Sequence, residues 1–385
     1  MTDPFEVPPS PFFTDEHHAF RTQVRRFVEQ EIAPHVNDWD EAESFPRELY
    51  ARAAGIGLLQ IGYPEEYGGI AADRFFNLIV SQELARAGCG GLSASLMSHT
   101  IGTPHIAQFG SDELKNRVLP PVLAGEKIAA LAVTEPSGGS DVANLRTTAR
   151  RDGDDYIVNG QKMFITSGMR ADIYTVAVRT GGPGLKGISL IMIERDTPGF
   201  SRTPLKKMGW WASDTAALYF DDCRVPAANL IGAENEGFKA IMANFNNERH
   251  GMASSALGFA RTCLNEAVAY ARERQTFGRP LIENQVIRHK LVDMAMRINA
   301  GQAYLEQLTW RMSQGEQPVA DFSMLKVLAT TTMEYCANEA MQVLGGAGYL
   351  RGAKVERIYR ETKVMSIGGG SIEIMKDLAA RQLGL

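Results

Sequence analysis

The segment most informative about the architecture is Leu131-Ala-Val-Thr-Glu-Pro-Ser-Gly-Gly-Ser-Asp141. A short apolar run ends at Thr134, and a glycine-rich turn follows it. Backbone N–H groups in such a turn can gather around an acceptor atom or a phosphate, and Thr134 and Ser140 add hydroxyl donors. The turn lacks the Gly-Lys-Ser/Thr ending of a P-loop and the ribose-binding acid of a dinucleotide fingerprint. Taken alone, such a turn is a weak signal, since it is more often an ordinary β-turn than a ligand-binding one.

Around this stretch, residues 127–230 have the pattern of a small β-domain. Short alternating or β-branched runs predict strands at Ile128–Val133, Tyr156–Val158, Ile173–Val178, Ile188–Ile193 and Ala217–Phe220. Turn signals separate the runs, at Asp152-Gly153, Asn159-Gly160 and Gly181–Gly184. Because Asn-Gly between apolar runs is a strong hairpin signal, we expect packed antiparallel strands with a hairpin at Asn159-Gly160.

The flanking regions are predicted to be helical. Thr14 and Ser111 each precede acidic residues, which is typical of a capped helix start. After the β region, helical spacing predicts four helices, at 237–274, 284–313, 321–344 and 371–383. The predicted class is therefore α+β, with a helical N-domain (1–125), a middle antiparallel β-domain (126–232) and a C-terminal four-helix bundle (233–385).

Composition narrows the function classes. The chain has 385 residues, a formal net charge of −5 and no basic bias that would suggest nucleic acid. No window approaches roughly 18 uninterrupted apolar residues, so no membrane span is expected. The four cysteines are far apart and the histidines are scattered, which predicts reduced thiols and no metal site. Together with an acidic, proline-rich N-terminus that does not look like a secretion signal, this predicts a cytoplasmic protein.

Several motifs in the same order resemble the acyl-CoA dehydrogenase family. Besides Leu131–Asp141, they are Asn159-Gly-Gln-Lys-Met-Phe-Ile-Thr-Ser-Gly168, Arg272-Glu-Arg-Gln-Thr-Phe-Gly-Arg-Pro280, Gln342-Val-Leu-Gly-Gly-Ala-Gly-Tyr349 and Val355-Glu-Arg-Ile-Tyr-Arg-Glu-Thr-Lys363. The resemblance runs from about residue 15 to the C-terminus. It implies an FAD-dependent enzyme that desaturates an acyl-CoA, passes its electrons to an electron-transfer flavoprotein, and forms a homotetramer or at least a dimer.

The resemblance also implies a set of FAD contacts. Thr134 would form a hydrogen bond with the pyrimidine end of the flavin, and Ser140 would lie by the pyrophosphate and the acyl-CoA. Phe164 and Thr166 would pack against the isoalloxazine; tryptophan is usual at 164, and phenylalanine keeps the aromatic wall but loses the indole N–H. The residues that would hold the FAD of a neighbouring subunit are Arg274, Thr276, Phe277, Gln285, Gln342, Gly345 and Gly346, while Ser371 and Glu373 would contact the FAD on the near side.

Without the resemblance, these features have plainer readings. Arg274 would be a solvated charge at a helix end, and Gly345-Gly346 would be glycines that cap a helix. An arginine beside a diphosphate nevertheless makes chemical sense, because its guanidinium donates forked, charge-assisted hydrogen bonds.

The residue at 369 is the departure from the family that matters most. In many members the segment after Val355–Lys363 carries the glutamate that removes the substrate's α-proton while the β-hydride goes to flavin N5. Here Ser366-Ile-Gly-Gly-Gly-Ser371 places Gly369 in that slot. Glycine cannot act as a base, but its backbone N–H can still polarise the thioester oxygen, as the family implies.

Glu248 is the candidate for a relocated base. It lies three residues after Phe245 and four before Met252, so it projects into an apolar stripe of its helix. Burial there would raise the pKa of the carboxyl, as a base working near neutral pH requires. The alternative is that Glu248 pairs with Arg249 or with another arginine of the bundle.

A subgroup resemblance favours Glu248 as the base. Isovaleryl-CoA and long-chain acyl-CoA dehydrogenases carry their base on this helix, in a Glu-Arg pair that matches Glu248-Arg249, and lack the later glutamate. Arg249 and Asn246 would then lie near the CoA, although aspartate is common at 246, and Gly370 would lie by the acyl group. The glycines at 368–370 could admit a methyl branch, or they could simply let the backbone approach FAD.

The acyl chain stays open at this stage, as do two rival functions. Small residues after Glu248, from Gly251 to Gly258, could leave room for an acyl chain or could permit close helix packing. One rival is a related flavin oxidase or monooxygenase, which needs no α-proton base. The other is a non-catalytic relative that acts as a binding or assembly protein.

Overall fold

The computed structural model describes residues 9–385, so most of the N-terminal stretch that bears on secretion lies outside the described residues. The chain forms two compact units. One, here called the bundle unit, comprises the residues up to Asp38, Asp73–Ser93 and Arg249–Leu385. The other, the sheet unit, comprises Trp39–Ala72 and Ala94–Glu248.

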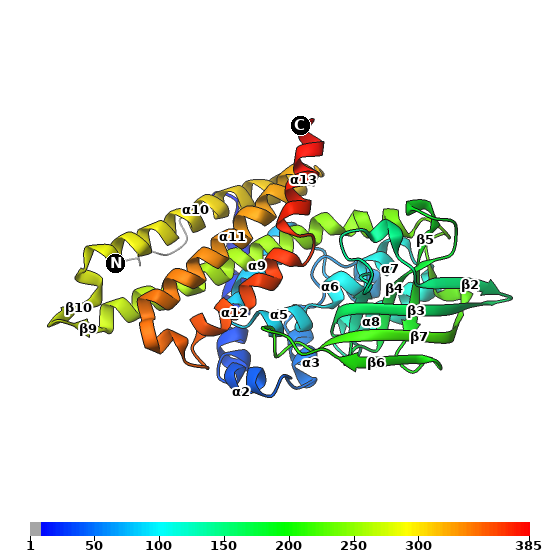
Figure 1. Ribbon diagram of the computed structural model, residues 1–385, viewed down its shortest axis with the longest axis horizontal. Coiled ribbons are helices and arrows are strands. Elements are labelled where there is room, and N and C mark those ends of the chain that lie inside the picture. Colours follow the sequence, from blue (N-terminus) through cyan, green and yellow to red (C-terminus); the bar gives the residue numbers. More distant parts are fainter. Residues whose placement is uncertain (1–8) are drawn as a thin grey trace. The chain divides into compact units, whose positions relative to one another are not determined.

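The N-terminal third is helical, as predicted (Figure 1). Its longer helices begin at polar caps: the Thr14 hydroxyl accepts from His17 N, and the Ser111 hydroxyl accepts from Leu114 N. Both predicted helix starts are therefore confirmed. The helices are α1 (Asp15–Phe27), which continues as a π-helix over Val28–Ile32, α2 (Val36–Glu41), α3 (Glu48–Gly55), α4 (Arg74–Ala85), α5 (Gly90–Leu96), α6 (His99–Gly102), α7 (Pro104–Phe109) and α8 (Asp112–Leu123).

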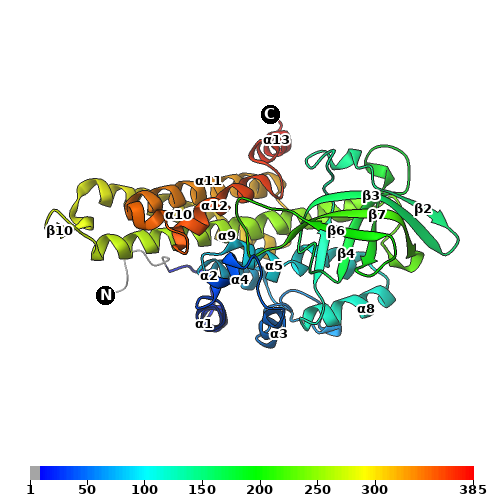
Figure 2. The ribbon, with the colours of Figure 1, turned by 60° about the horizontal axis from the view of Figure 1, so that its bottom comes forward.

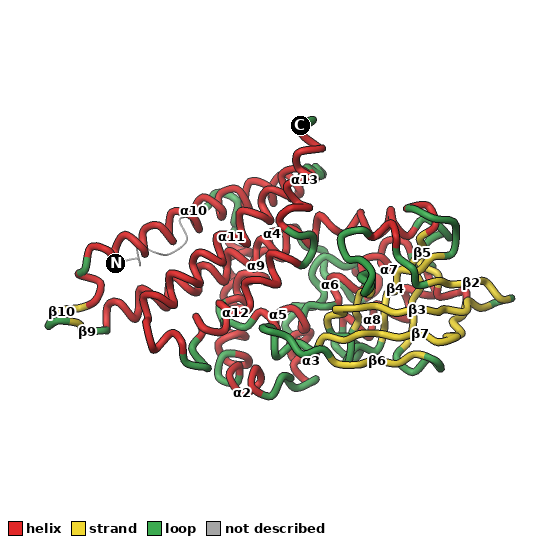
Figure 3. Tube along the Cα trace, viewed as in Figure 1, coloured by secondary structure: helices red, strands yellow, loops and turns green. Residues whose placement is uncertain are grey.

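The strands of the sheet unit, yellow in Figure 3, form one sheet in which most neighbours are antiparallel. Its path is β6-β7-β3-β2-β4-β5-β8, with β1 beside β4; the β1–β4 and β2–β4 pairings are parallel. The strands are β1 (Ala129–Ala132), β2 (Thr148–Asp152), β3 (Asp155–Thr166), β4 (Ile173–Arg179), β5 (Ile188–Glu194), β6 (Phe200–Pro204), β7 (Thr215–Pro226) and β8 (Leu230–Ile231).

The predicted hairpin at Asn159-Gly160 is wrong. Asn159 pairs with Thr148 inside β3, and the β3–β7 register shifts between Val158 and Gly160, so the dipeptide marks a bulge and not a turn. A Cβ on Gly160 would lie 2.7 Å from Thr147 Cα, which explains the glycine. The chain reverses instead at Gly153, between β2 and β3, where φ is +61°.

One face of the sheet is covered by helices of the same unit. Leu114, Val118 and Val122 of α8 pack with residues of β4 and β5, and Ile241, from the first turns of α9 (Gly237–Glu273), joins the same core. Burying these side chains stabilises the sheet by roughly 1.5–3 kcal/mol for each large one.

The bundle unit contains the remaining part of α9 with α10 (Gln285–Ser313), α11 (Val319–Leu344) and α13 (Ile372–Leu383), close to the predicted bounds (Figure 2). One further helix of the C-terminal region, α12 (Lys354–Ile367), was not predicted. Between α9 and α10 the chain forms a hairpin of β9 (Gln275–Thr276) and β10 (Arg279–Pro280). Within the described residues, none of the helices is long and apolar enough for a membrane crossing.

The small residues of α9 serve close packing at one position at least. A Cβ on Gly258 would lie 2.8 Å from Ala85 Cβ and 3.1 Å from Gln82 Cα, so α9 and α4 touch through this glycine. Gly251, by contrast, has no atom within 4 Å of where a Cβ would stand. Close helix packing thus explains the glycine at 258 but not the one at 251.

Candidate functional site

The two glycine- and threonine-bearing motifs of the sheet unit lie side by side. The backbone N–H of Met163, in β3, donates to the carbonyl of Thr134 over 2.8 Å. The turn then folds back, so that a Cβ on Gly139 would stand 3.4 Å from Thr134 Cγ2. Ser140 follows at the exposed tip of the turn. Thr134 and Ser140 are therefore carried by a turn that is fixed to β3.

A buried ion pair joins the same two motifs. Lys162 Nζ lies 2.8 Å from Glu135 Oε1, with the two side chains 0% and 4% exposed. Lys162 also donates to the Val133 carbonyl (3.0 Å), and Glu135 accepts the backbone N–H groups of Arg146 (2.6 Å) and Thr147 (2.9 Å). These contacts satisfy both charges and lock the end of β1 against β3.

Burial controls the titration of this pair. Desolvation lowers the pKa of Lys162 to about 8, although the carboxylate of Glu135 acts against it. Desolvation would raise the pKa of Glu135, but the charge and hydrogen bond of Lys162 and the two backbone donors outweigh it and lower that pKa. The sequence reasoning missed both residues, although each lies inside a motif that it had singled out.

Phe164 presents its aromatic ring at the surface of the sheet unit. The side chain is 67% exposed, and its φ is +62°, which is uncommon for a bulky residue. The β3–β7 register shifts between Lys162 and Ile165, so this irregularity turns the ring outward while Ile165 stays buried. Thr166 resumes the pairing, opposite Thr215. An exposed ring on a strained backbone suits a wall for a flat ligand.

Glu248 lies on α9, at the end of the part that belongs to the sheet unit. Its side chain is half-buried, and Oε1 accepts a hydrogen bond from Asn244 Nδ2, one turn earlier, over 2.8 Å. Asn246 is also buried, at 9% exposure. The Asn244 amide thus helps to orient this carboxylate from one turn earlier on the same helix.

Gly369 lies in the bundle unit, in the loop between α12 and α13. Its φ is +64°, and that of Gly370 is +106°, both in the region that favours glycine. A Cβ on Gly369 would stand 2.6 Å from Met252 Sδ. Met252 of α9 therefore fills the space that a side chain at 369 would need, and the sequence reasoning did not foresee this.

The other predicted residues of the near side surround the start of α13. Ser371 is its N-cap, because the hydroxyl accepts from Ile374 N over 3.4 Å. Glu373 is exposed, and its own backbone N–H and the Ser371 hydroxyl lower the pKa of its carboxyl. Arg249, at the start of the bundle-unit part of α9, is buried at 7% exposure.

The residues predicted to reach a neighbouring subunit's FAD are mostly exposed, at one end of α10 and α11. Phe277, at the tip of the β9–β10 hairpin, is fully exposed, with φ +52°. Lys290 of α10 pairs with Glu339 of α11, and this holds the two helices together near that end. A Cβ on Gly345 or Gly346 would touch nothing within 4 Å. The others here are Arg274, Thr276, Gln285 and Gln342.

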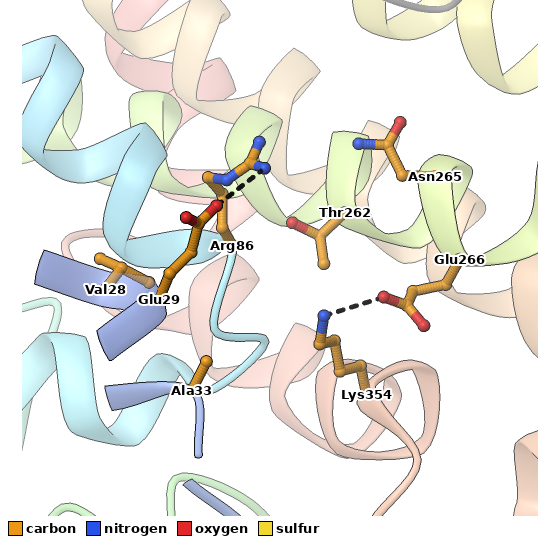
Figure 4. Close-up of a pocket in the computed structure, with 8 residues that line it drawn as sticks. All are labelled: Val28, Glu29, Ala33, Arg86, Thr262, Asn265, Glu266 and Lys354. Carbon is orange, nitrogen blue, oxygen red and sulfur yellow. Dashed lines mark hydrogen bonds and ion pairs between the residues drawn. The ribbon is translucent and has the colours of Figure 1, made fainter. Parts of the chain in front are cut away.

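The bundle unit also holds a pocket of about 190 Å³ between α1's extension, α4, α9 and α12 (Figure 4). Two ion pairs line it, Glu29 with Arg86 (4.0 Å) and Glu266 with Lys354 (2.9 Å). None of the residues predicted for function lines this pocket. Its charges neutralise each other across neighbouring elements, so it is better explained as part of the helix packing.

Comparisons with known proteins cover nearly the whole chain. Family models described as the N-terminal, middle and C-terminal domains of acyl-CoA dehydrogenase match residues 14–126, 130–223 and 235–384. Mitochondrial isobutyryl-CoA dehydrogenase of Bos taurus is 38% identical over 98% of this chain and 91% of its own length.

Solved structures agree with these matches. A putative acyl-CoA dehydrogenase from Mycobacterium smegmatis is 46% identical, with a TM-score of 0.96 over 97% of this chain and 99% of that one. A glutaryl-CoA dehydrogenase from the same organism, in complex with FADH2, is 30% identical, with a TM-score of 0.91 over 97% of this chain and 95% of that one.

Proposed function

We propose that this chain, which belongs to the acyl-CoA dehydrogenase family and is an oxidoreductase, uses FAD to desaturate the Cα–Cβ bond of an acyl-CoA. The exposed ring of Phe164 and the fixed turn at Thr134 fit a flavin, since they offer a flat apolar wall beside hydrogen-bonding groups. When bound, FAD would accept the β-hydride. Thr134, Ser140, Phe164 and Thr166 would hold it in one subunit, with Ser371 and Glu373.

The observation that carries the proposal is the pair of Glu248 and Gly369. Glu248 keeps a carboxylate on α9, oriented by Asn244, whereas the slot at 369 has no side chain and is filled by Met252. Glu248 would take the α-proton of the thioester as a general base. Gly369 would donate its backbone N–H to the thioester oxygen, where charge develops in the transition state.

Assembly is proposed on the same basis. The fully exposed Phe277 would be covered if the β9–β10 hairpin met another subunit's FAD, together with Arg274, Thr276 and Gln285. Gln342, Gly345 and Gly346 would reach the adenosine and pyrophosphate of that FAD. A homotetramer, or at least a dimer, is the assembly that this arrangement requires, and the three divisions at 1–125, 126–232 and 233–385 are its proposed domains.

The substrate is proposed only as a class. Ser140, Asn246, Arg249 and Gly370 would contact the acyl-CoA, whose chain is of medium to long length or methyl-branched. The isobutyryl-CoA dehydrogenase relative favours testing branched chains first. An electron-transfer flavoprotein is the proposed acceptor of the electrons, and a cytoplasmic location stays a prediction from the sequence.

Anaerobic bleaching of the bound flavin tests the reaction. Purified enzyme would be mixed with five thioesters: butyryl-, octanoyl-, palmitoyl-, isobutyryl- and isovaleryl-CoA. We expect the flavin absorbance to fall with at least one of them. A yellow protein that none of the five bleaches would favour a related oxidase or monooxygenase, and a colourless protein that FAD cannot reconstitute would favour a non-catalytic relative.

The Glu248→Gln variant tests the base. It should keep FAD and bind acyl-CoA, but lose turnover on the order of a hundredfold or more, because an amide cannot accept the α-proton. Glu266→Gln is the matched control: the same change on the same helix, at a carboxylate that pairs with Lys354. Near-normal turnover in Glu248→Gln would refute the assignment.

A further inference from the structure

Lys326 is a fully buried lysine that neither the family motifs nor the proposed mechanism uses. It lies on α11, with 0% of its surface exposed. Its Nζ donates to the carbonyl of Gly370 over 2.6 Å and to the carbonyl of Ser366 over 3.4 Å. These two carbonyls stand at opposite ends of the glycine loop.

The hydrogen-bond acceptors of Lys326 within residues 9–385 are peptide carbonyls and not a carboxylate. Ser366 lies in the last turn of α12, where carbonyls lack partners within the helix and the helix dipole is negative. A cation is favourable there, and hydrogen bonds from a charged donor are stronger than those between neutral groups. The lysine therefore caps α12 and fastens the far end of the loop with the same ammonium.

The loop between these ends needs such fastening. Three successive glycines, 368–370, have more conformational freedom to lose than any other residues. Met252 contacts the position of Gly369 on one side, as its Sδ would stand 2.6 Å from a Cβ there. Contact on one side limits the loop's movement in that direction only, whereas the two bonds from Lys326 fix both of its ends.

We propose that Lys326 is a positioning residue, which holds the Gly369 N–H where it meets the thioester oxygen. The inference rests on the proposed function for the role of that N–H. Lys326 acts through the loop and touches neither the substrate nor the cofactor. The group that this N–H would contact is the carbonyl oxygen of an acyl thioester.

A second contact from α11 supports this role. Glu334 lies eight residues after Lys326, on the same face of the helix, and accepts the Ser366 hydroxyl over 2.6 Å. Burial lowers the pKa of Lys326 to about 8, and the charge of Arg249 adds to the effect. The ammonium thus remains mostly protonated at pH 7, with its charge available to the two carbonyls.

The test compares Lys326→Met, which removes the donors, with Lys326→Gln, which keeps an amide donor on a shorter arm. Thr330→Val is the matched control, because Thr330 lies one turn further on the same face. Among residues 9–385 its hydroxyl donates to two carbonyls of its own helix (2.9 and 3.3 Å). Two quantities are measured in the FAD-loaded enzyme. One is the flavin bleaching rate against the concentration of whichever of the five thioesters bleaches wild type fastest. The other is amide hydrogen exchange over residues 364–375, without substrate.

For Lys326→Met we expect the limiting bleaching rate to fall on the order of tenfold, part of the hundredfold or more that losing an oxyanion donor costs. The half-saturating concentration should stay within about twofold, because an interaction made only in the transition state is lost. Exchange over 364–375 should quicken while exchange elsewhere is unchanged. Lys326→Gln should change in the same direction, and by less.

The outcomes separate the two proposals. Wild-type bleaching rates together with unchanged exchange, in either variant that folds, would overturn the role of Lys326. A change equal to that of Thr330→Val would do the same, since it would reflect packing alone. If no thioester bleaches wild type, the proposed function fails, and the positioning role of Lys326 fails with it, whatever the exchange shows.

Discussion

Lys162 in the sheet unit and Lys326 in the bundle unit are alike in burial and differ in their partners. Both are 0% exposed, and burial lowers the pKa of each to about 8. Lys162 pairs with the carboxylate of Glu135, whereas Lys326 donates to peptide carbonyls. The first arrangement balances two charges and locks strands together. The second places a single charge of α11 against the two ends of the glycine loop, so we expect Lys326 to matter more for rate than for stability.

The largest expected effect on stability comes from breaking the ion pair. Lys162→Met leaves Glu135 buried without its cation, which should destabilise the protein by about 3–5 kcal/mol. Urea unfolding, followed by circular dichroism, measures the loss. The double variant Glu135→Gln/Lys162→Met removes both charges and should recover part of it. If the single variant is no less stable than the double, the pair does not lock β1 to β3 as described.

The next effect compares two glycines of nearly equal φ. Gly153, in the sheet unit, has φ +61° and nothing within 4 Å of a Cβ, while Gly369 has φ +64° and faces Met252. Gly153→Ala should lower the free energy of unfolding by about 1–2 kcal/mol, because alanine is strained in a left-handed backbone conformation. Gly369→Ala should have the same backbone cost and a further loss of about 1–3 kcal/mol, because the new methyl group would be overpacked against Met252.

The same comparison can be sharpened with a second substitution. Met252→Ala removes the thioether that faces position 369, so Gly369→Ala should cost no more in that background than Gly153→Ala does in wild type. Urea unfolding of the four variants checks this. Equal costs for the two glycines in wild type would mean that Met252 yields easily and does not close the slot.

Local sequence signals predicted the parts of the fold that depend on neighbours in the chain. The caps at Thr14 and Ser111 are confirmed, and so are the long helices, because cap and periodicity act within a few residues. Strands β2 and β6 were missed since they carry mostly polar, exposed residues, as edge and hairpin strands can. The Asn159-Gly160 dipeptide was wrongly predicted to form a hairpin turn, because β-bulges and turns both favour glycine.

Long-range contacts explain the other omissions. Helix α12 looks polar in sequence, yet Arg357 is buried against the Gly88 carbonyl (2.7 Å), and Glu361 accepts the backbone N–H of Gly90 (2.7 Å). Local sequence patterns cannot predict such partners, because they lie about 270 residues away in the chain. Lys326 was missed for the same reason. The motif residues, by contrast, came from family resemblance, and their roles stay predictions.

The smallest expected effect is the pH dependence of Lys326. Its pKa is about 8 in the folded protein and about 10.5 in the unfolded chain. Between these values the unfolded state binds more protons, so the contribution of Lys326 to stability rises with pH above 8. Relative to Lys326→Met, wild type should gain about 1–2 kcal/mol between pH 8 and 9.5. Urea unfolding of both proteins at several pH values measures this gain, with Thr330→Val expected to follow wild type. If the difference in unfolding free energy between wild type and Lys326→Met does not change with pH, Lys326 keeps its proton over this range. The two carbonyl hydrogen bonds would then have to stabilise the charged form enough to offset burial.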